Sequence, residues 1–133
     1  MTDDELRALL QRVRTIAVVG LSANPYRDSH SVAAYMQRHG YRIIPVNPNL
    51  RGPVLGEQPY AGLQDVAESI DLVNIFRRSE YVAEVVDTAI ARQAGGIWMQ
   101  LGVFSAPAAE RAAAAGVPII MNRCIAVEHR RLL

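Results

Sequence analysis

The turn after the first apolar segment carries residues that could bind an anion. Residues 15–24 read T-I-A-V-V-G-L-S-A-N, so a run rich in β-branched side chains ends at Gly20 and small residues follow. Glycine has no Cβ, and Gly20 would therefore allow a sharp turn and a close approach of the backbone to a ligand. If a helix comes next, its dipole and the backbone amides of Gly20, Leu21, Ser22 and Ala23 would face the anion. We predict a pyrophosphate site, although Gly20 could be only a turn residue and Ser22 a cap or turn residue.

Covalent catalysis has little support in the sequence. Cys124 is the only cysteine, and His129 lies five residues after it. A nucleophile needs a base within hydrogen-bond reach and a group that orients this base. Glu128 and His129 are adjacent, so only one of them can readily share a helical face with Cys124. We therefore expect a structural thiol that is buried or partly buried.

The absence of lysine excludes two further kinds of site. All 14 basic residues are arginine, which rules out a P-loop lysine and a Schiff base. The three histidines and the single cysteine have no metal-ligand spacing. We predict no metal site.

The length and composition predict one globular domain, residues 1–133. Half of the residues are hydrophobic and 20% are charged, as in an ordinary soluble protein. The net charge of +1 argues against nucleic-acid and membrane binding. No apolar run approaches the roughly 18 residues of a membrane span, and the acidic start does not resemble a signal peptide. A single cysteine fits a reducing compartment, so we expect a cytoplasmic protein.

Apolar strand-like runs alternate with amphipathic helical segments along the chain. We predict strands at residues 15–20, 41–46, 71–76, 96–101 and 117–121, and helices at 2–13, 29–39, 63–69, 79–92, 105–115 and 125–132. This alternation predicts an α/β, Rossmann-like three-layer fold with a five-stranded parallel sheet, in the order 3-2-1-4-5. Ligands would then bind at the carboxyl ends of the strands, where the order reverses between strands 1 and 4.

The residues that follow the strands favour a ligand with an extra phosphate over NAD. A dinucleotide fingerprint has three glycines and an acidic residue at the end of the second strand. Here one glycine is present, the second strand ends at Asn47, and the only carboxylate between Gly20 and Glu57 is Asp28. Arg42 lies nearby in the sequence. NADP or the 3′-phosphate of coenzyme A (CoA) would both suit this neighbourhood.

Several spaced motifs together resemble a known family. They are V-V-G-L-S-x-x-P, P-V-N-P, F-R, W-M-Q-L-G and N-R-C-I-x-x-E-H, in this order, from Val18 to His129. The chain resembles the small stand-alone CoA-binding proteins of bacteria, which are similar to the CoA-binding domain of the succinyl-CoA synthetase α chain. The resemblance implies a Rossmann-like fold that binds CoA across the strand ends. There is no second domain and no counterpart of a phosphohistidine segment, so synthetase catalysis is not implied.

The resemblance also implies roles for individual residues. Gly20 and Ser22 would hold the pyrophosphate, with Arg27 as a phosphate partner. Asn47 and Pro48 would lie beside the adenosine, and Phe76 and Arg77 would flank the pantetheine or clamp a phosphate. Trp98 and Gln100 would lie toward the far side of the crevice. The residues alone leave other readings open. Trp98 could belong to the core, Gln100 needs a hydrogen-bond partner from protein or ligand, and Arg27 and Arg77 could be solvated surface residues.

We therefore expect a protein that binds CoA or a short acyl-CoA as a carrier, sensor or partner subunit, without catalysis of its own. An NADP-dependent oxidoreductase or an enzyme subunit that needs a partner is the alternative, and a regulatory module with a vestigial pocket is a third. A protein partner or a homo-oligomer is compatible with the amphipathic segment at residues 2–13. A thiol close to bound CoA would also allow a mixed disulfide with Cys124.

Overall fold

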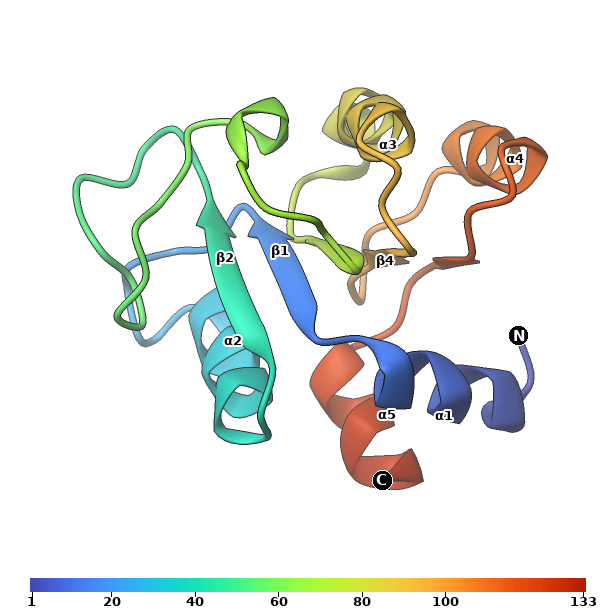
Figure 1. Cartoon of the computed structure of the whole chain (residues 1–133), viewed down its shortest axis with the longest axis horizontal. Coiled ribbons are helices and arrows are strands. Elements are labelled where there is room, and N and C mark those ends of the chain that lie inside the picture. The colour runs from blue at the N-terminus through green and yellow to red at the C-terminus, as the bar shows by residue number, and fades with distance from the viewer.

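Five parallel strands form one sheet with helices on both of its faces (Figure 1). The computed structural model describes residues Met1–Leu133. The strands are β1 (Thr15–Val19), β2 (Arg42–Val46), β3 (Leu72–Ile75), β4 (Ile97–Met99) and β5 (Ile119–Ile120). The α-helices are α1 (Asp3–Arg12), α2 (Asp28–Arg38), α3 (Val82–Ala91), α4 (Ala106–Ala114) and α5 (Ile125–Leu132). The predicted Rossmann-like α/β fold is confirmed, and none of the helices has the length and apolar character needed to cross a membrane.

The strand order is β2-β1-β3-β4-β5, and all neighbouring strands are parallel. Beyond β2, Tyr60 forms an isolated parallel bridge with Val46, and its N–H donates to the carbonyl of Pro45 at 3.0 Å. With this bridge counted as a rudimentary third strand, the sheet follows the predicted 3-2-1-4-5 pattern. Residues 72–75 then take the fourth place and lie beside β1. The order reverses between β1 and β3, and a ligand crevice is expected at their carboxyl ends.

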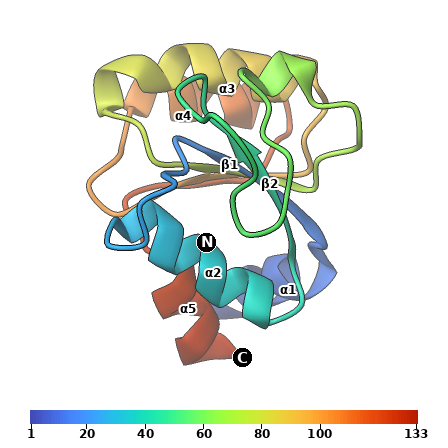
Figure 2. The same cartoon turned by 90° about the vertical axis from the view of Figure 1, so that its left-hand side faces the viewer.

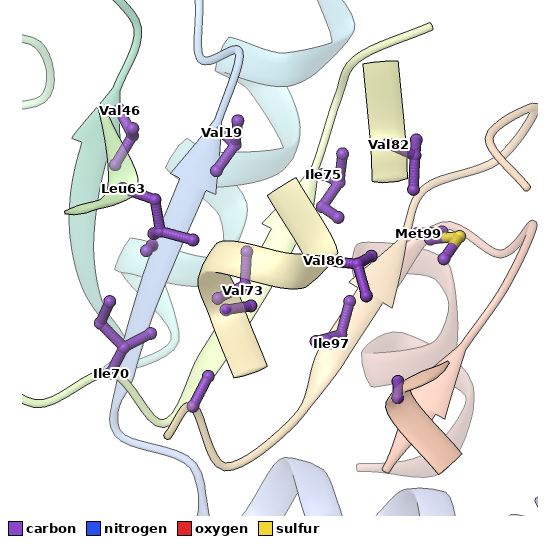
Figure 3. Packing of buried hydrophobic residues seen from close by; sticks show 14 of the residues in the cluster. Val19, Val46, Leu63, Ile70, Val73, Ile75, Val82, Val86, Ile97 and Met99 are labelled. Atoms are coloured by element: carbon purple, nitrogen blue, oxygen red, sulfur yellow. The ribbon is translucent and has the colours of Figure 1, made fainter. Parts of the chain in front are cut away.

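Two apolar cores join the layers, because both faces of a parallel sheet must be covered. Helices α3 and α4 cover one face, and α1, α2 and α5 cover the other (Figures 1 and 2). The first core packs Val73 and Ile97 of the sheet against Val86 of α3 (Figure 3). The second core packs Ile16 and Trp98 against the opposite helices.

Most helix ends follow local signals in the sequence, but two predictions were wrong. Thr2 and Glu5 form a reciprocal capping box at the start of α1, and Ser105 caps α4, as expected for these residue types. Residues 63–69 form only a 3₁₀ turn at Leu63–Asp65. The helix predicted at 79–92 begins later than expected. The hydroxyl of Ser79 accepts the N–H of Phe104 at 3.1 Å, and α3 begins after a 3₁₀ turn at Ser79–Tyr81.

Helix α5 is held in place by α1. The guanidinium of Arg131 contacts both carboxylate oxygens of Asp3 at 2.9 Å, and this hydrogen bonding lowers the pKa of Asp3 below its usual value. Arg7 Nε donates to the carbonyl of Leu132 at 3.1 Å. The two helices therefore lie side by side, and the position of α5 depends on α1.

The turn after β1 requires glycine. Gly20 has φ +90°, and a Cβ at this position would lie 2.5 Å from the carbonyl oxygen of Phe76. Its N–H also donates to the carbonyl of Val46 at 2.8 Å. The turn is therefore pressed between the ends of β2 and β3.

Replacing Gly20 should lower the free energy of unfolding more than replacing a glycine that has a positive φ but no close neighbour. Gly40 has φ +95° with no atom within 4 Å of an added Cβ. We expect Gly40→Ala to lower the free energy of unfolding by about 1 kcal/mol. Gly20→Ala should lower it by about 3 kcal/mol or more, because strand ends must also move. Urea unfolding of both variants tests this, and equal losses would contradict the close contact.

His129 of α5 is buried against α2. Its side chain lies with Nδ1 2.9 Å from the hydroxyl of Tyr35, and its ring centre is 5.0 Å from that of His39. Burial, together with the nearby His39, lowers the pKa of His129. In the pH range between its folded and unfolded pKa values the unfolded chain binds this proton more readily, so stability falls as the pH falls.

The free energy of unfolding should therefore decrease as the pH is lowered from about 7 to about 5, the range in which histidine titrates. His129→Leu removes the titrating group and should flatten this dependence. Urea unfolding at several pH values measures both slopes. The lowered pKa values of Asp3, Glu5 and Glu68 act at lower pH. An unchanged slope in His129→Leu would assign the pH dependence to other groups.

Candidate functional site

A polar cavity of about 520 Å³ lies at the carboxyl ends of β1, β2 and β3. It is lined by Gly20, Ser22, Arg27, Asp28, Ser29, Asn47, Asn49 and Phe76. Five of the predicted site residues, from three separate segments, thus meet in one cavity: Gly20, Ser22, Arg27, Asn47 and Phe76. The cavity lies at the place where the strand order reverses.

The loop between β1 and α2 is folded by its own small polar side chains. The N–H of Ser22 donates to the hydroxyl of Ser29, and the N–H of Asn24 donates to the hydroxyl of Ser22, both at 3.0 Å. The N–H of Tyr26 donates to Oδ1 of Asn24 at 3.0 Å. These bonds, formed between neighbouring residues, fix the loop without support from long side chains.

Four backbone amides around this loop have no partner within the chain. They belong to Leu21, Ala23, Asp28 and Ser29, the last two in the first turn of α2. Unpaired amides at the start of a helix, together with the helix dipole, favour an anion. Arg27 adds a positive charge at the cavity, and Asp28 adds a negative one. The arrangement can bind a phosphate through backbone donors.

Asn47 connects two of the loops that form the cavity. Its Nδ2 donates to the carbonyl of Leu21 at 3.1 Å, and its Oδ1 accepts the N–H of Asn49 at 3.0 Å. Its own N–H donates to the carbonyl of Tyr60 at 2.9 Å. An aspartate could not donate to the Leu21 carbonyl, so the amide here is a requirement of the loop structure.

A second cavity, of about 320 Å³, adjoins the first. Its walls are Asp28, Val32, Phe76, Gln100, Leu101, Cys124 and Val127, mostly apolar groups from α2, the end of β4 and α5. Asp28 and Phe76 also line the polar cavity. The two cavities are therefore compartments of one crevice, the first polar and the second apolar.

Gln100 is the polar side chain at the inner wall of the apolar compartment. It is 5% exposed. Its Oε1 accepts from Nδ2 of Asn74 at 3.2 Å and from the N–H of Ile125 at 3.3 Å. The side-chain oxygen of Gln100 is therefore hydrogen-bonded within the protein, as expected for a buried polar group, and it fixes the start of α5.

Arg77 and Pro48 lie outside this crevice, in a third cavity of about 210 Å³ on the α3 side of the strand ends. The guanidinium of Arg77 lies over the ring of Tyr81, 4.9 Å from its centre. Glu84 lines the same cavity. The structure thus separates Arg77 from Arg27, although both lie close to Gly20 in the fold.

Three other predicted residues do not present side chains to the crevice. Trp98 is fully buried in the core, where its indole N–H donates to the carbonyl of Arg123 at 2.8 Å, and it lines none of the cavities. Its expected place at the far side of the crevice is corrected to the core beneath α5. Leu21 is also fully buried and Ala23 is exposed, so each of them has only its backbone to offer.

The sequence reasoning missed several residues that line the crevice. Ser29 and Asn49 carry polar groups beside predicted residues, and their small polar side chains near strand ends could have identified them. Val32 and Val127 form apolar walls. They were missed because their position depends on how α2 and α5 pack, which no local pattern shows.

The comparisons with known proteins give a family model, a curated relative and solved structures that each cover most or all of the chain. Residues 14–130 match the family model described as "CoA binding domain". The uncharacterized protein YneT of Bacillus subtilis (strain 168) is 41% identical over 125 residues, which cover 94% of this chain and 92% of YneT. A solved structure from Thermus thermophilus has a TM-score of 0.96 with 36% identity and covers 100% of both chains. A hypothetical protein from Pyrococcus horikoshii OT3 has a TM-score of 0.95 with 37% identity, over 99% of this chain and 92% of that one.

The role of Asn47 in the loops can be measured as stability. Asn47→Ala removes the bonds to Leu21 and Asn49 and should lower the free energy of unfolding by about 1–2 kcal/mol. Asn49→Ala is the matched control, because the Asn49 side chain lines the same cavity and only its backbone N–H takes part in this link. Urea unfolding of the two variants should differ. Equal stability would mean that Asn47 does not join the loops.

Proposed function

The chain belongs to the CoA binding domain family, and on this premise we propose that it binds CoA or a short acyl-CoA in the two-compartment crevice. The observation that carries the proposal is the continuity between a polar compartment rich in backbone donors and an apolar compartment. CoA has the same division, with a phosphorylated nucleotide at one end and a pantetheine arm at the other.

The polar compartment suits the pyrophosphate. The unpaired amides of Asp28 and Ser29 belong to residues that line it, and those of Leu21 and Ala23 lie in the adjoining loop. Hydrogen bonds from such groups to an ionised phosphate are stronger than those between neutral groups. Arg27 supplies a cation at the same cavity. These donors are fixed before the ligand arrives, so little ordering cost opposes binding.

The end of β2 favours CoA over NAD. An NAD site uses a carboxylate there to bind the ribose hydroxyls, whereas this chain has Asn47, whose amide is engaged with the neighbouring loop. Pro48 and Arg77 line the cavity on the other side of this strand end. We infer that Arg77 interacts with the 3′-phosphate beside the adenosine.

The crevice suits binding better than catalysis. Acid–base chemistry needs titratable groups within reach of the reacting atoms, and the two compartments are lined by a single carboxylate, Asp28, a single thiol, Cys124, and no histidine. We therefore propose a carrier, a sensor or a partner subunit that presents CoA to another protein.

Calorimetric titration with CoA, dephospho-CoA, NADPH and NADH, with a reducing agent present, tests the proposal. We expect a Kd for CoA of about 1–10 μM, a free energy of roughly −7 to −8 kcal/mol, weaker binding of dephospho-CoA, and no heat with NADH. Binding of NADPH without binding of CoA would replace the proposal with an oxidoreductase. If none of the four ligands gives a heat of binding, the proposal that the crevice binds CoA is wrong.

The arginine variants assign the phosphates in the same experiment. Arg27→Ala should weaken CoA and dephospho-CoA alike, by at least about tenfold, because both ligands carry the pyrophosphate. Arg77→Ala should weaken CoA but not dephospho-CoA. Arg38→Ala, at the other end of α2, makes the same change in charge and should have no effect. Equal effects of all three would show only a general dependence on net charge.

A further inference from the structure

The apolar compartment holds two polar groups that phosphate binding does not use. One is the side-chain amide of Gln100, and the other is the thiol of Cys124. Both come from segments at the inner end of the crevice, away from Arg27 and the loop after β1. They indicate what lies at the end of a bound ligand.

The orientation of the Gln100 amide is determined by its neighbours. Its Oε1 accepts two hydrogen bonds, from Asn74 Nδ2 and from the N–H of Ile125. A flipped amide would place its NH₂ group against these two donors, so the flip is excluded. Nε2 then has no hydrogen-bond partner in the chain. Every fully buried side-chain nitrogen does have a partner, so Nε2 must have some open surface. Nε2 of this 95% buried residue therefore faces the cavity as a free donor.

Cys124 lies next to the residue that Gln100 holds. It is the N-terminal cap residue of α5, directly before Ile125, and it is partly buried with the cavity on its open side. It is the only cysteine, so it cannot form a disulfide within the chain. Its disulfide chemistry must involve a thiol from outside.

We propose that Cys124 is a site of covalent attachment for CoA, formed by exchange with the disulfide form of CoA, and that Gln100 Nε2 guides the arm by donating to an amide carbonyl of pantetheine. This inference rests on the proposed function, because the same crevice must first bind the nucleotide. Pantetheine carries one hydroxyl and two amide groups along an arm that ends in a thiol. A free buried donor followed by a thiol matches that order.

The exchange step needs no further oxidant. The Cys124 thiolate attacks one sulfur of the CoA disulfide, a new sulfur–sulfur bond forms to Cys124, and the old one breaks. The second CoA leaves as a thiolate and takes up the proton that Cys124 lost. A free thiol reverses the step. Occupancy of the crevice would thus follow the ratio of oxidised to reduced CoA.

Intact-mass spectrometry of the full chain, after mixing with a disulfide, measures the rate of attachment. We compare CoA disulfide with glutathione disulfide at equal concentration. We expect CoA attachment to be at least about tenfold faster, because binding in the crevice raises the effective concentration of the disulfide at Cys124. Attachment at or below the glutathione rate would overturn the proposal.

Gln100→Glu tests the second part of the proposal. It keeps oxygens for Asn74 and Ile125 but removes the free donor. The added carboxylate beside Cys124 slows attack on either disulfide, so the diagnostic quantity is the ratio of the CoA rate to the glutathione rate, which should fall. Gln11→Glu, on the exposed side of α1, is the matched change in charge and should alter neither rate. If Gln100→Glu changed both rates equally, Gln100 would only support α5, and its guiding role would be overturned.

Reversible CoA binding to the reduced wild-type chain separates the two proposals. In the presence of a reducing agent no disulfide persists, so calorimetry reports the crevice alone. Reversible binding without selective attachment would overturn the role of Cys124 and retain the CoA site. If reduced CoA does not bind and attachment is unselective, both proposals are wrong.

Discussion

The contact between Gly20 and the carbonyl at the end of β3 determines the geometry of the site. The carbonyl of Phe76 occupies the space that a side chain at residue 20 would need. The turn after β1 can therefore lie against the sheet, and the chain leaves it toward α2. The first turn of α2 then opens onto the strand ends. The anion-binding amides, the Asn47 link and the continuation into the apolar compartment all follow from this one close approach.

The crevice depends on directed hydrogen bonds more than on net charge. Its polar part is built from serine, asparagine and backbone groups, and its single arginine is opposed by a neighbouring carboxylate, Asp28. The whole chain has a net charge of only +1. Long-range attraction of an anionic ligand is therefore weak, and discrimination must come from donors at fixed positions. Asn47 and Ser29 serve this end by holding loops, although neither contributes a charge.

Much of the fold could be predicted because its signals are local. The β-branched run before Gly20 predicted β1, apolar residues at helical spacing predicted the long helices, and the spaced motifs pointed to the family that residues 14–130 match. The prediction of a helix at residues 63–69 was wrong for a physical reason. The apolar residues Leu63 and Val66 pack into the core on the α3 side from a single 3₁₀ turn and the chain after it, and their spacing alone resembles a helix.

The site was harder to predict. How deeply a side chain is buried, and on which side of a strand end it lies, depend on the tertiary packing. Trp98 in β4 and Gln100 just after it both contact the segment that leads into α5. The sequence could not show that α5 covers Trp98, or that Gln100 forms part of the buried wall of a cavity. Arg27 and Arg77 line different cavities, on two sides of the strand ends, and the sequence did not show this separation. Which side of a strand end a loop residue takes depends on the next helix, and no single residue encodes this.

The pairing of α1 with α5 gives the crevice an order of completion during synthesis. The polar compartment uses residues 20–76, whereas a wall of the apolar compartment lies on α5, which is translated after every other element described. Asp3 and Arg7 can form their hydrogen bonds only after Arg131 and Leu132 have been translated. A nascent chain would thus present its phosphate-binding half well before the half that surrounds a thiol. The second compartment can close only after α5 has been translated, and a chain cut short before α5 would lack one of its walls.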